Sequence, residues 1–261
     1  MRGLILAEYE RIFQRKSTKI LFGISILFQI FNFMLLQVHW KNSTVILKRG
    51  VELPLDNLNY AVMQLLDFNV VLIFIILPLY FSECLSLELD TGAYKMILLR
   101  PIKKWKLLVS KWIAIASTYA LTLLCVYLTK TLIGYMFMPK VKSTKYFILT
   151  SSVGIGGSIL YNLKYYLIIF LIHLSLLGIT SLISTIVKKP ILTFLGSITF
   201  ILTSIYLFKP MFDIFFKTTE IGYYILAGSY NFNNIYIVLI ITLCCLGTSL
   251  FIWNKRIGKM V

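Results

Sequence analysis

The chain has 261 residues, of which 59% are hydrophobic and 14% are charged, and its mean hydropathy is +0.85. A soluble globular domain needs a more polar surface than this, so the composition indicates an integral membrane protein. The net charge of +16 would suit a nucleic-acid-binding protein. Lys and Arg flank the apolar runs, however, as topology signals and contacts with anionic lipid do. We therefore expect membrane lipids, and no nucleic acid, among its partners.

Residues 1–19 predict an amphipathic helix that lies at the membrane surface ahead of the first apolar run. Apolar residues recur there at helical spacing. In this interpretation Glu8, Arg11 and Arg15 occupy the opposite, polar side of the helix. The apolar side consists of Leu4, Ile5, Tyr9, Ile12 and Phe13.

Six apolar runs follow, each about as long as the roughly 20 residues that cross a bilayer as a helix. The predicted spans are about 20–38, 61–82, 112–137, 164–187, 191–208 and 235–253. The sequence thus predicts an all-α integral membrane protein, with 1–261 as a single transmembrane domain.

The segment 209–234, between the last two spans, is too apolar for a freely solvated loop. We expect it to dip into the outer leaflet as short helices, with Gly222 and Gly228 as breaks. Between the fourth and fifth spans, Lys188-Lys189-Pro190 predicts a tight hinge.

Asp67, Lys130 and His173 are polar residues inside the predicted spans. Asp67 falls near the outer end of the second span, where a solvated position at the water interface is the favoured interpretation and a buried substrate contact the other. We expect Lys130, in the outer part of the third span, to extend its charge to the interface. His173, in the middle of the fourth span, is expected to form a hydrogen bond between helices.

The fifth span is unusually rich in hydroxyls and small residues. This pattern fits two interpretations, close helix packing or a face that lines a substrate path, and the residues alone leave both open. The candidate path residues are Asn69, Thr199, Phe200 and Thr203.

The stretch from Phe81 to Trp112 is the longest mixed-charge interruption between two apolar runs. It opens with acids and ends with bases, so it cannot lie in hydrocarbon, yet its apolar residues suit a helix at the membrane surface. We expect 83–111 to be a cytoplasmic segment whose acidic first half meets a partner and whose basic second half, Arg100 to Lys111, rests on lipid headgroups. Lys and Arg are more numerous on the side that holds both termini, which predicts cytoplasmic termini.

This stretch resembles the type-2 permeases, the transmembrane subunits of ABC exporters. In that family an acid follows the second span, then a Gly/Thr step, a Leu-Leu run, a proline, and a small residue with Lys entering the third span. Lys103-Lys104 departs from the family's Ser-Arg after the proline. The matching residues are Phe81-Ser82-Glu83, Asp90-Thr91-Gly92, Leu98-Leu99-Arg100-Pro101-Ile102 and Val109-Ser110-Lys111.

The resemblance implies a permease that pairs with a second copy or a homologous permease and binds two cytoplasmic ABC ATPase subunits. It also implies that a coupling helix between the second and third spans seats on the ATPase. The residues that it assigns to coupling are Glu83, Glu88, Asp90, Thr91, Gly92, Arg100 and Pro101. The chain has no Walker motif, so ATP hydrolysis would belong to the separate subunit.

Together these features predict a permease subunit of an exporter in the cell membrane. Its cargo is expected to be amphipathic or hydrophobic (a peptide, antimicrobial, lipid or drug), as in the small bacterial lantibiotic-type export permeases that it resembles. One alternative is a non-transporting immunity or sensor protein that binds a peptide. An intramembrane enzyme fits less well, because His39, His173 and the scattered acids form no cluster. We expect no cofactor and no metal, since Cys84, Cys125, Cys244 and Cys245 lack ligand spacing.

Overall fold

The computed structural model describes residues 1–35, 44–46, 52–93, 103–149 and 151–257. Among these residues, six helices are long and apolar enough to cross a membrane, as the sequence predicts. The chain therefore has the fold of a multi-pass membrane protein.

Successive helices form the spans. The first is α2 (Lys16–Leu35), and the second consists of α3 (Tyr60–Met63), α4 (Leu65–Val71), the π-helical η2 (Leu72–Ile76) and α5 (Leu77–Asp90). The other four are α7 (Lys104–Phe137), α8 (Ile155–Val187), α9 (Pro190–Leu207) and α12 (Asn233–Ile257).

Shorter elements lie before and between the spans. They are α1 (Arg2–Gln14), α10 (Lys209–Phe216), α11 (Thr218–Leu226) and two antiparallel hairpins, β1 (Thr44–Ile46) with β2 (Glu52–Pro54) and β3 (Ser143–Thr144) with β4 (Val153–Gly154).

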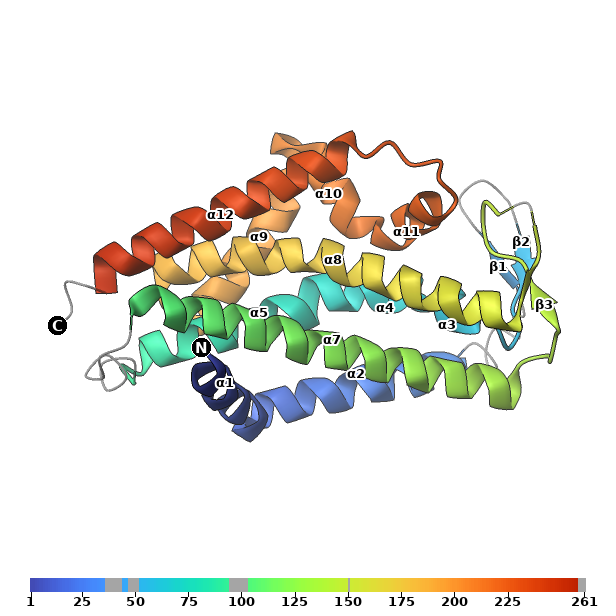
Figure 1. The fold of residues 1–261 in the computed structure, drawn as a ribbon, viewed down its shortest axis with the longest axis horizontal. Coiled ribbons are helices and arrows are strands. Elements are labelled where there is room, and N and C mark those ends of the chain that lie inside the picture. The colour runs from blue at the N-terminus through green and yellow to red at the C-terminus, as the bar shows by residue number, and fades with distance from the viewer. Residues whose placement is uncertain (36–43, 47–51, 94–102, 150, 258–261) are drawn as a thin grey trace.

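The long helices run roughly side by side, with α8 in the middle of the bundle, in contact with α5, α7, α9, α11 and α12 (Figure 1). Both hairpins lie at one end. The C-terminal end of α5, the start of α7 and the last turns of α12 lie at the opposite end. We call these the hairpin end and the α5/α7 end. Because α1 packs on α7, it lies across the bundle towards the α5/α7 end.

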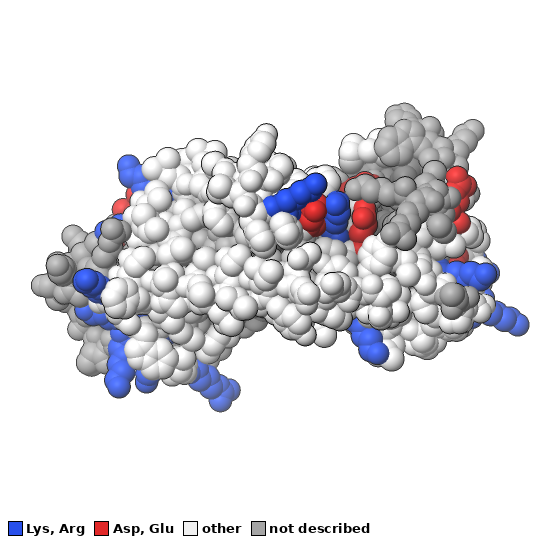
Figure 2. Space-filling model, turned by 90° about the horizontal axis from the view of Figure 1, so that it is seen from above, with Lys and Arg blue, Asp and Glu red and all other residues white. Residues whose placement is uncertain are grey.

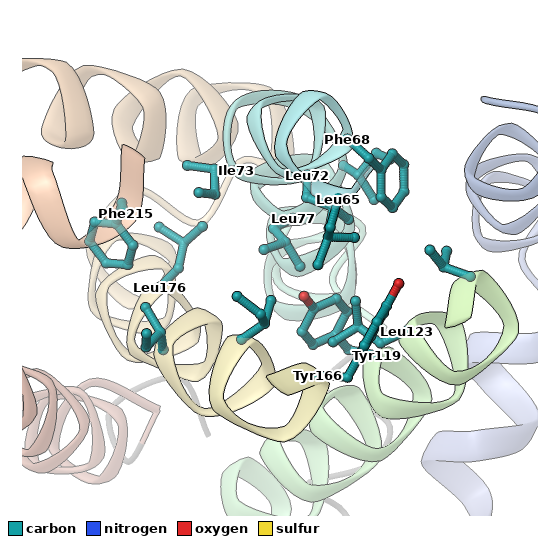
Figure 3. Close-up of a cluster of buried hydrophobic side chains, with 14 of the residues drawn as sticks. Leu65, Phe68, Leu72, Ile73, Leu77, Tyr119, Leu123, Tyr166, Leu176 and Phe215 are labelled. Atoms are coloured by element: carbon teal, nitrogen blue, oxygen red, sulfur yellow. The ribbon is translucent and has the colours of Figure 1, made fainter. Parts of the chain in front are cut away.

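The core lies where α4, η2 and α5 face α7 and α8. Figure 3 shows Leu72 and Leu77 pointing from the second span towards Tyr119 of α7 and Leu176 of α8, and all four are buried. Phe215 of α10 closes one side of this cluster. The burial of such large side chains is the main contribution that packing makes to this arrangement.

The second span is irregular in two places. Gln64 separates α3 from α4, and η2 ends at Ile76, two residues before Pro78. Proline has no N–H, so the carbonyl one turn earlier, that of Phe74 in η2, loses its α-helical donor. A wider π turn at this point is a common way to accommodate such a loss.

The hairpin end is held by a buried polar group around Asp56. One carboxylate oxygen accepts hydrogen bonds from the backbone N–H groups of Leu58 (2.8 Å) and Asn59 (2.9 Å). The other accepts one from the Thr144 hydroxyl. Beside it, the Tyr146 hydroxyl donates to Asn162 at 2.8 Å. Burial raises the pKa of Tyr146 above its ordinary value.

The structure moves several predicted boundaries. The helix of the third span, α7, begins at Lys104 rather than at 112. Most of the expected basic half of the coupling segment, Arg100 to Lys111, therefore forms the first turns of α7. The helix of the fourth span, α8, begins at Ile155 rather than at 164. Both helices extend beyond the hydrocarbon thickness, which an apolar-run criterion does not detect because their ends are polar.

The segment 209–234 does contain short helices, α10 and α11. Gly228 follows α11 with a left-handed φ of 70°, as expected of a break. The prediction for Gly222 was wrong, because it lies inside α11, against the ring of Tyr165. The hinge at Lys188-Lys189-Pro190 is confirmed: Lys188 is left-handed with φ 63°, and Pro190 begins α9.

Candidate functional site

Five charged side chains meet at the α5/α7 end of the bundle. We call them the ion cluster: Glu8, Arg11 and Arg15 of α1, Glu88 of α5 and Lys111 of α7. Glu8 is 4% exposed, Glu88 7% and Lys111 1%. Charges are buried to this extent only when they are paired.

Lys111 is the centre of the ion cluster. Its Nζ lies 2.8 Å from Glu88 Oε2 and 3.1 Å from Glu8 Oε2, and it donates to the Cys84 carbonyl at 3.4 Å. One ammonium thus contacts two carboxylates from two different helices, α1 and α5.

The arginines complete the ion cluster from α1. Arg15 lies 3.1 Å from Glu88 Oε1, and its other terminal nitrogen donates to the Glu83 carbonyl at 3.1 Å. Arg11 lies 2.7 Å from Glu8 Oε1 and 3.7 Å from Glu88 Oε2. Three cations and two carboxylates therefore fasten α1 to the end of α5 and to α7.

The ion cluster corrects the expected orientation of α1. We predicted Glu8 on the polar side, away from Ile12, but both are buried against the bundle. Phe13, predicted on the apolar side, is 41% exposed. The spacing of four residues between Glu8 and Ile12 places them on one face of a helix, and this was the available signal.

The residues assigned to coupling fall into three groups. Glu88 is buried in the ion cluster, where cations of α1 and α7 contact it. Asp90 and Thr91 are exposed at the end of α5, Glu83 is partly buried, and Gly92 has a left-handed φ of 71°. Arg100 and Pro101 lie outside the described residues.

A cavity of about 390 Å³ lies beside the ion cluster. Its walls include Arg11, Arg15 and Glu88, together with Ala93 just past the end of α5. The charged group is thus reached from the surface at the point where the connection between the second and third spans begins.

Three of the four candidate path residues lie together. Thr199, Phe200 and Thr203 line a cavity of about 540 Å³ beside α9, whose other walls come from α8, α10 and α12. Asn69 lies elsewhere, fully buried in α4. Neither of its amide atoms has a hydrogen-bond partner within the part of the chain that the structure describes.

The hydroxyls of α9 divide between two faces. Thr193 pairs with Ser86 of α5 at 2.9 Å, and Ser197 donates to Thr180 of α8 at 3.3 Å. These buried hydroxyls serve helix packing, whereas Thr199 and Thr203 face the cavity. Close helix packing thus accounts for Thr193 and Ser197, and a role in a substrate path stays a prediction for Thr199 and Thr203.

The structure also places the other three polar residues that the sequence singled out within the spans, His173, Lys130 and Asp67. His173 Nδ1 pairs with the Tyr119 hydroxyl of α7, which confirms the predicted bond between helices. The prediction for Lys130 was wrong: its side chain is buried, and Nζ donates to the Gln64 carbonyl at the break between α3 and α4. Asp67 is exposed on the surface of the bundle rather than buried.

Among the described residues, no group of His, Cys, Asp and Glu is arranged to hold a metal ion. Comparisons of the chain with protein-family models, with curated proteins and with solved structures gave no match. The fold and the site together define a multi-pass membrane protein in which buried ion pairs fasten an N-terminal helix to the second and third spans.

Proposed function

We propose that the chain is the membrane-spanning permease subunit of an ATP-driven ABC exporter that moves an amphipathic or hydrophobic substrate out of the cell. The observation that carries this proposal is the ion cluster, which joins α1 to the two spans on either side of the 91–103 connection. In the family that the sequence resembles, this connection meets the ATPase. Both termini would then lie in the cytoplasm.

The ion cluster would transmit a displacement from the ATPase contact to the helices that it joins. A push at the 91–103 connection reaches α5 and α7 first, since these helices end and begin there. Buried ion pairs resist separation because each lost partner leaves an uncompensated charge. α1, α5 and α7 would therefore move together, as a rigid body, when ATP draws two ATPase subunits together.

The substrate path would lie along α9. This helix leaves a broad apolar face exposed, with Tyr206 at 90% and Leu207 at 80% exposure, and Thr199 and Thr203 add hydroxyls to it. A face of this kind suits contact with a second permease copy and with an amphipathic cargo. The mixed apolar and hydroxyl character of the cavity beside α9 supports the same substrate class.

Asp90 provides the sharpest test of the coupling contact. Reversal of Glu88 would disrupt the ion cluster itself, whereas Asp90 is exposed at the end of α5. We expect Asp90→Lys to reduce the amount of ATPase that co-purifies with the protein by about tenfold or more, the range measured for charges in protein interfaces.

The matched control is Glu52→Lys, which makes the same charge change on an exposed residue at the hairpin end. It should leave the amount of co-purified ATPase unchanged, and both variants should insert normally. Equal ATPase recovery with wild type and Asp90→Lys would contradict the placement of the contact. A protein that binds a peptide but retains no ATPase would instead support the immunity or sensor alternative.

A further inference from the structure

A long apolar groove opens between α7, α8 and α12, on a different part of the bundle from the cavity beside α9. Its volume is about 710 Å³, within the range of small-molecule sites. The walls are almost entirely hydrocarbon, from Ile113 and Ala116 of α7, Leu171 of α8 and Leu239 of α12 among others. The Thr242 hydroxyl, also in the wall, is occupied by a bond to the Val238 carbonyl at 2.7 Å.

The groove results from the way in which α12 crosses α8. At the crossing, Gly178 lets Thr242 approach so closely that an added Cβ would lie 2.8 Å from Thr242 Cγ2. Below it, towards the α5/α7 end, Trp112 donates to Ser181 at 2.9 Å, and Ser181 pairs with Ser249 at 3.1 Å. Towards α10 the two helices diverge (Figure 1), and the residues that line the groove come from both of them.

Water is a poor occupant for this groove, because its walls offer too few hydrogen-bond partners. The groove lies among membrane spans, so the surrounding medium is lipid. On the face drawn in Figure 2, charged side chains lie towards the ends of the molecule and in one group near its middle, and the broad surface around them is uncharged. A flexible hydrocarbon chain is therefore the occupant that fits the walls.

The charges at one end of the groove indicate which lipid would occupy it. Trp253 of α12 donates to the Lys104 carbonyl at 3.1 Å, which brings the start of α7 and the end of α12 together. Lys104, Lys106 and Lys255 lie there, and neither α7 nor α12 contains an acidic residue. Eight residues of helix, about 12 Å, separate Lys104 from Trp112 at the end of the groove. This distance suits a headgroup at the interface with its chain in the groove.

We propose that this groove binds one acyl chain of an anionic phospholipid, whose phosphate rests on Lys104, Lys106 and Lys255. The site does not depend on the proposed transport function, and it lies away from the cavity of Thr199 and Thr203.

The proposal can be tested by photocrosslinking of the full-length protein in lipid nanodiscs. The probes are phosphatidylglycerol and phosphatidylcholine that carry the same diazirine-labelled acyl chain, and mass spectrometry maps the labelled peptides. We expect phosphatidylglycerol to label 168–177 and 235–246 about tenfold more strongly than phosphatidylcholine does. Equal labelling by the two probes would overturn the headgroup assignment.

Two pairs of variants sharpen the test. Changing Lys104, Lys106 and Lys255 to Gln should remove most of the preference for phosphatidylglycerol. The control changes Lys140, Lys142 and Lys145, exposed residues of the hairpin end, to Gln and should retain it. Leu171→Trp should reduce groove labelling at least about threefold, whereas Leu202→Trp on the exposed face of α9 should not.

Thermal unfolding checks that each variant is folded before labelling is compared. If folded Leu171→Trp protein is labelled at 168–177 as strongly as the wild type, the acyl chain does not lie in the groove and the proposal is wrong. Crosslinks between two copies of the protein through the groove, in place of lipid labelling, would show that a second copy occupies it and would also overturn the proposal.

Discussion

At the ion cluster a single lysine bridges two buried carboxylates, each of which an arginine of α1 also contacts. Lys111 Nζ lies within 3.1 Å of both Glu8 and Glu88, and all three side chains are almost completely buried. Removal of one partner from a buried ion pair is far more costly than replacement of the whole group. The cluster therefore predicts a marked asymmetry between single and combined substitutions.

We expect Lys111→Met to lower the free energy of unfolding by about 3–5 kcal/mol, because Glu8 and Glu88 lose their central cation. Thermal or denaturant unfolding of the purified protein in detergent measures this change. Adding Glu8→Gln and Glu88→Gln to Lys111→Met should restore much of the loss, since no buried carboxylate then remains charged.

The control for that experiment is Lys106→Met, on the same helix but partly exposed. Its effect should stay within about 0.5 kcal/mol, as is usual for surface substitutions. A Lys111→Met protein that is as stable as the Lys106→Met protein would contradict the account of the ion cluster.

The partners of Lys111 could not be predicted from the sequence. Lys111 was recognised only as a basic residue entering the third span, and Glu8 only as part of a polar helix face. Each pairing joins residues about 100 positions apart, or 23 in the case of Glu88 and Lys111. Such contacts depend on how α1, α5 and α7 come together, which periodicity within one helix does not specify.

Among the elements, α8 and α12 show how one small residue sets the distance between two helices. A Cβ added at Gly178 would lie 2.8 Å from Thr242 Cγ2 and 3.2 Å from the Thr242 carbonyl oxygen. Close backbone approach through a small residue is a common means of packing membrane helices. The crossing fixes the place at which the groove between these helices closes.

We expect Gly178→Ala to destabilise the protein by about 1–3 kcal/mol, because the new methyl group must displace α12. Gly247→Ala is the matched control, since a Cβ there meets nothing within 4 Å, and it should be neutral or slightly stabilising through helix propensity. Unfolding of both variants in detergent compares them. Equal stability of the two proteins would show that α8 and α12 do not pack closely at Gly178.

The boundaries of helices were predictable only where the residue types change at the boundary. The six apolar runs identified six helices, and Lys188-Lys189-Pro190 marked a real hinge. The break at Gln64, by contrast, has no Gly or Pro to signal it, and Lys130 donates to its carbonyl from another helix. The prediction that Lys130 would reach the interface failed for the same reason, since its partner lies 66 positions away.

For the whole molecule, composition and the six apolar runs were sufficient to predict a multi-pass membrane protein. It could not predict that Thr199, Phe200 and Thr203 would share a cavity while Asn69 lies apart from them, because that depends on the packing of α9 against α8, α10 and α12. In the proposed exporter, this cavity and the exposed face of α9 would serve the substrate path, and the ion cluster would couple the spans to the ATPase. An ATPase partner and a second permease copy are its two requirements.

The most direct test of the central claim is the mass of the intact complex, measured by native mass spectrometry after gentle extraction of the full-length protein from its own membrane. The expected mass is that of two permease chains bound to two ABC ATPase subunits. The two permease chains are either two copies of this chain or one copy with a homologous permease. Recovery of this chain alone, with no ATPase under conditions that preserve membrane complexes, would contradict the central claim.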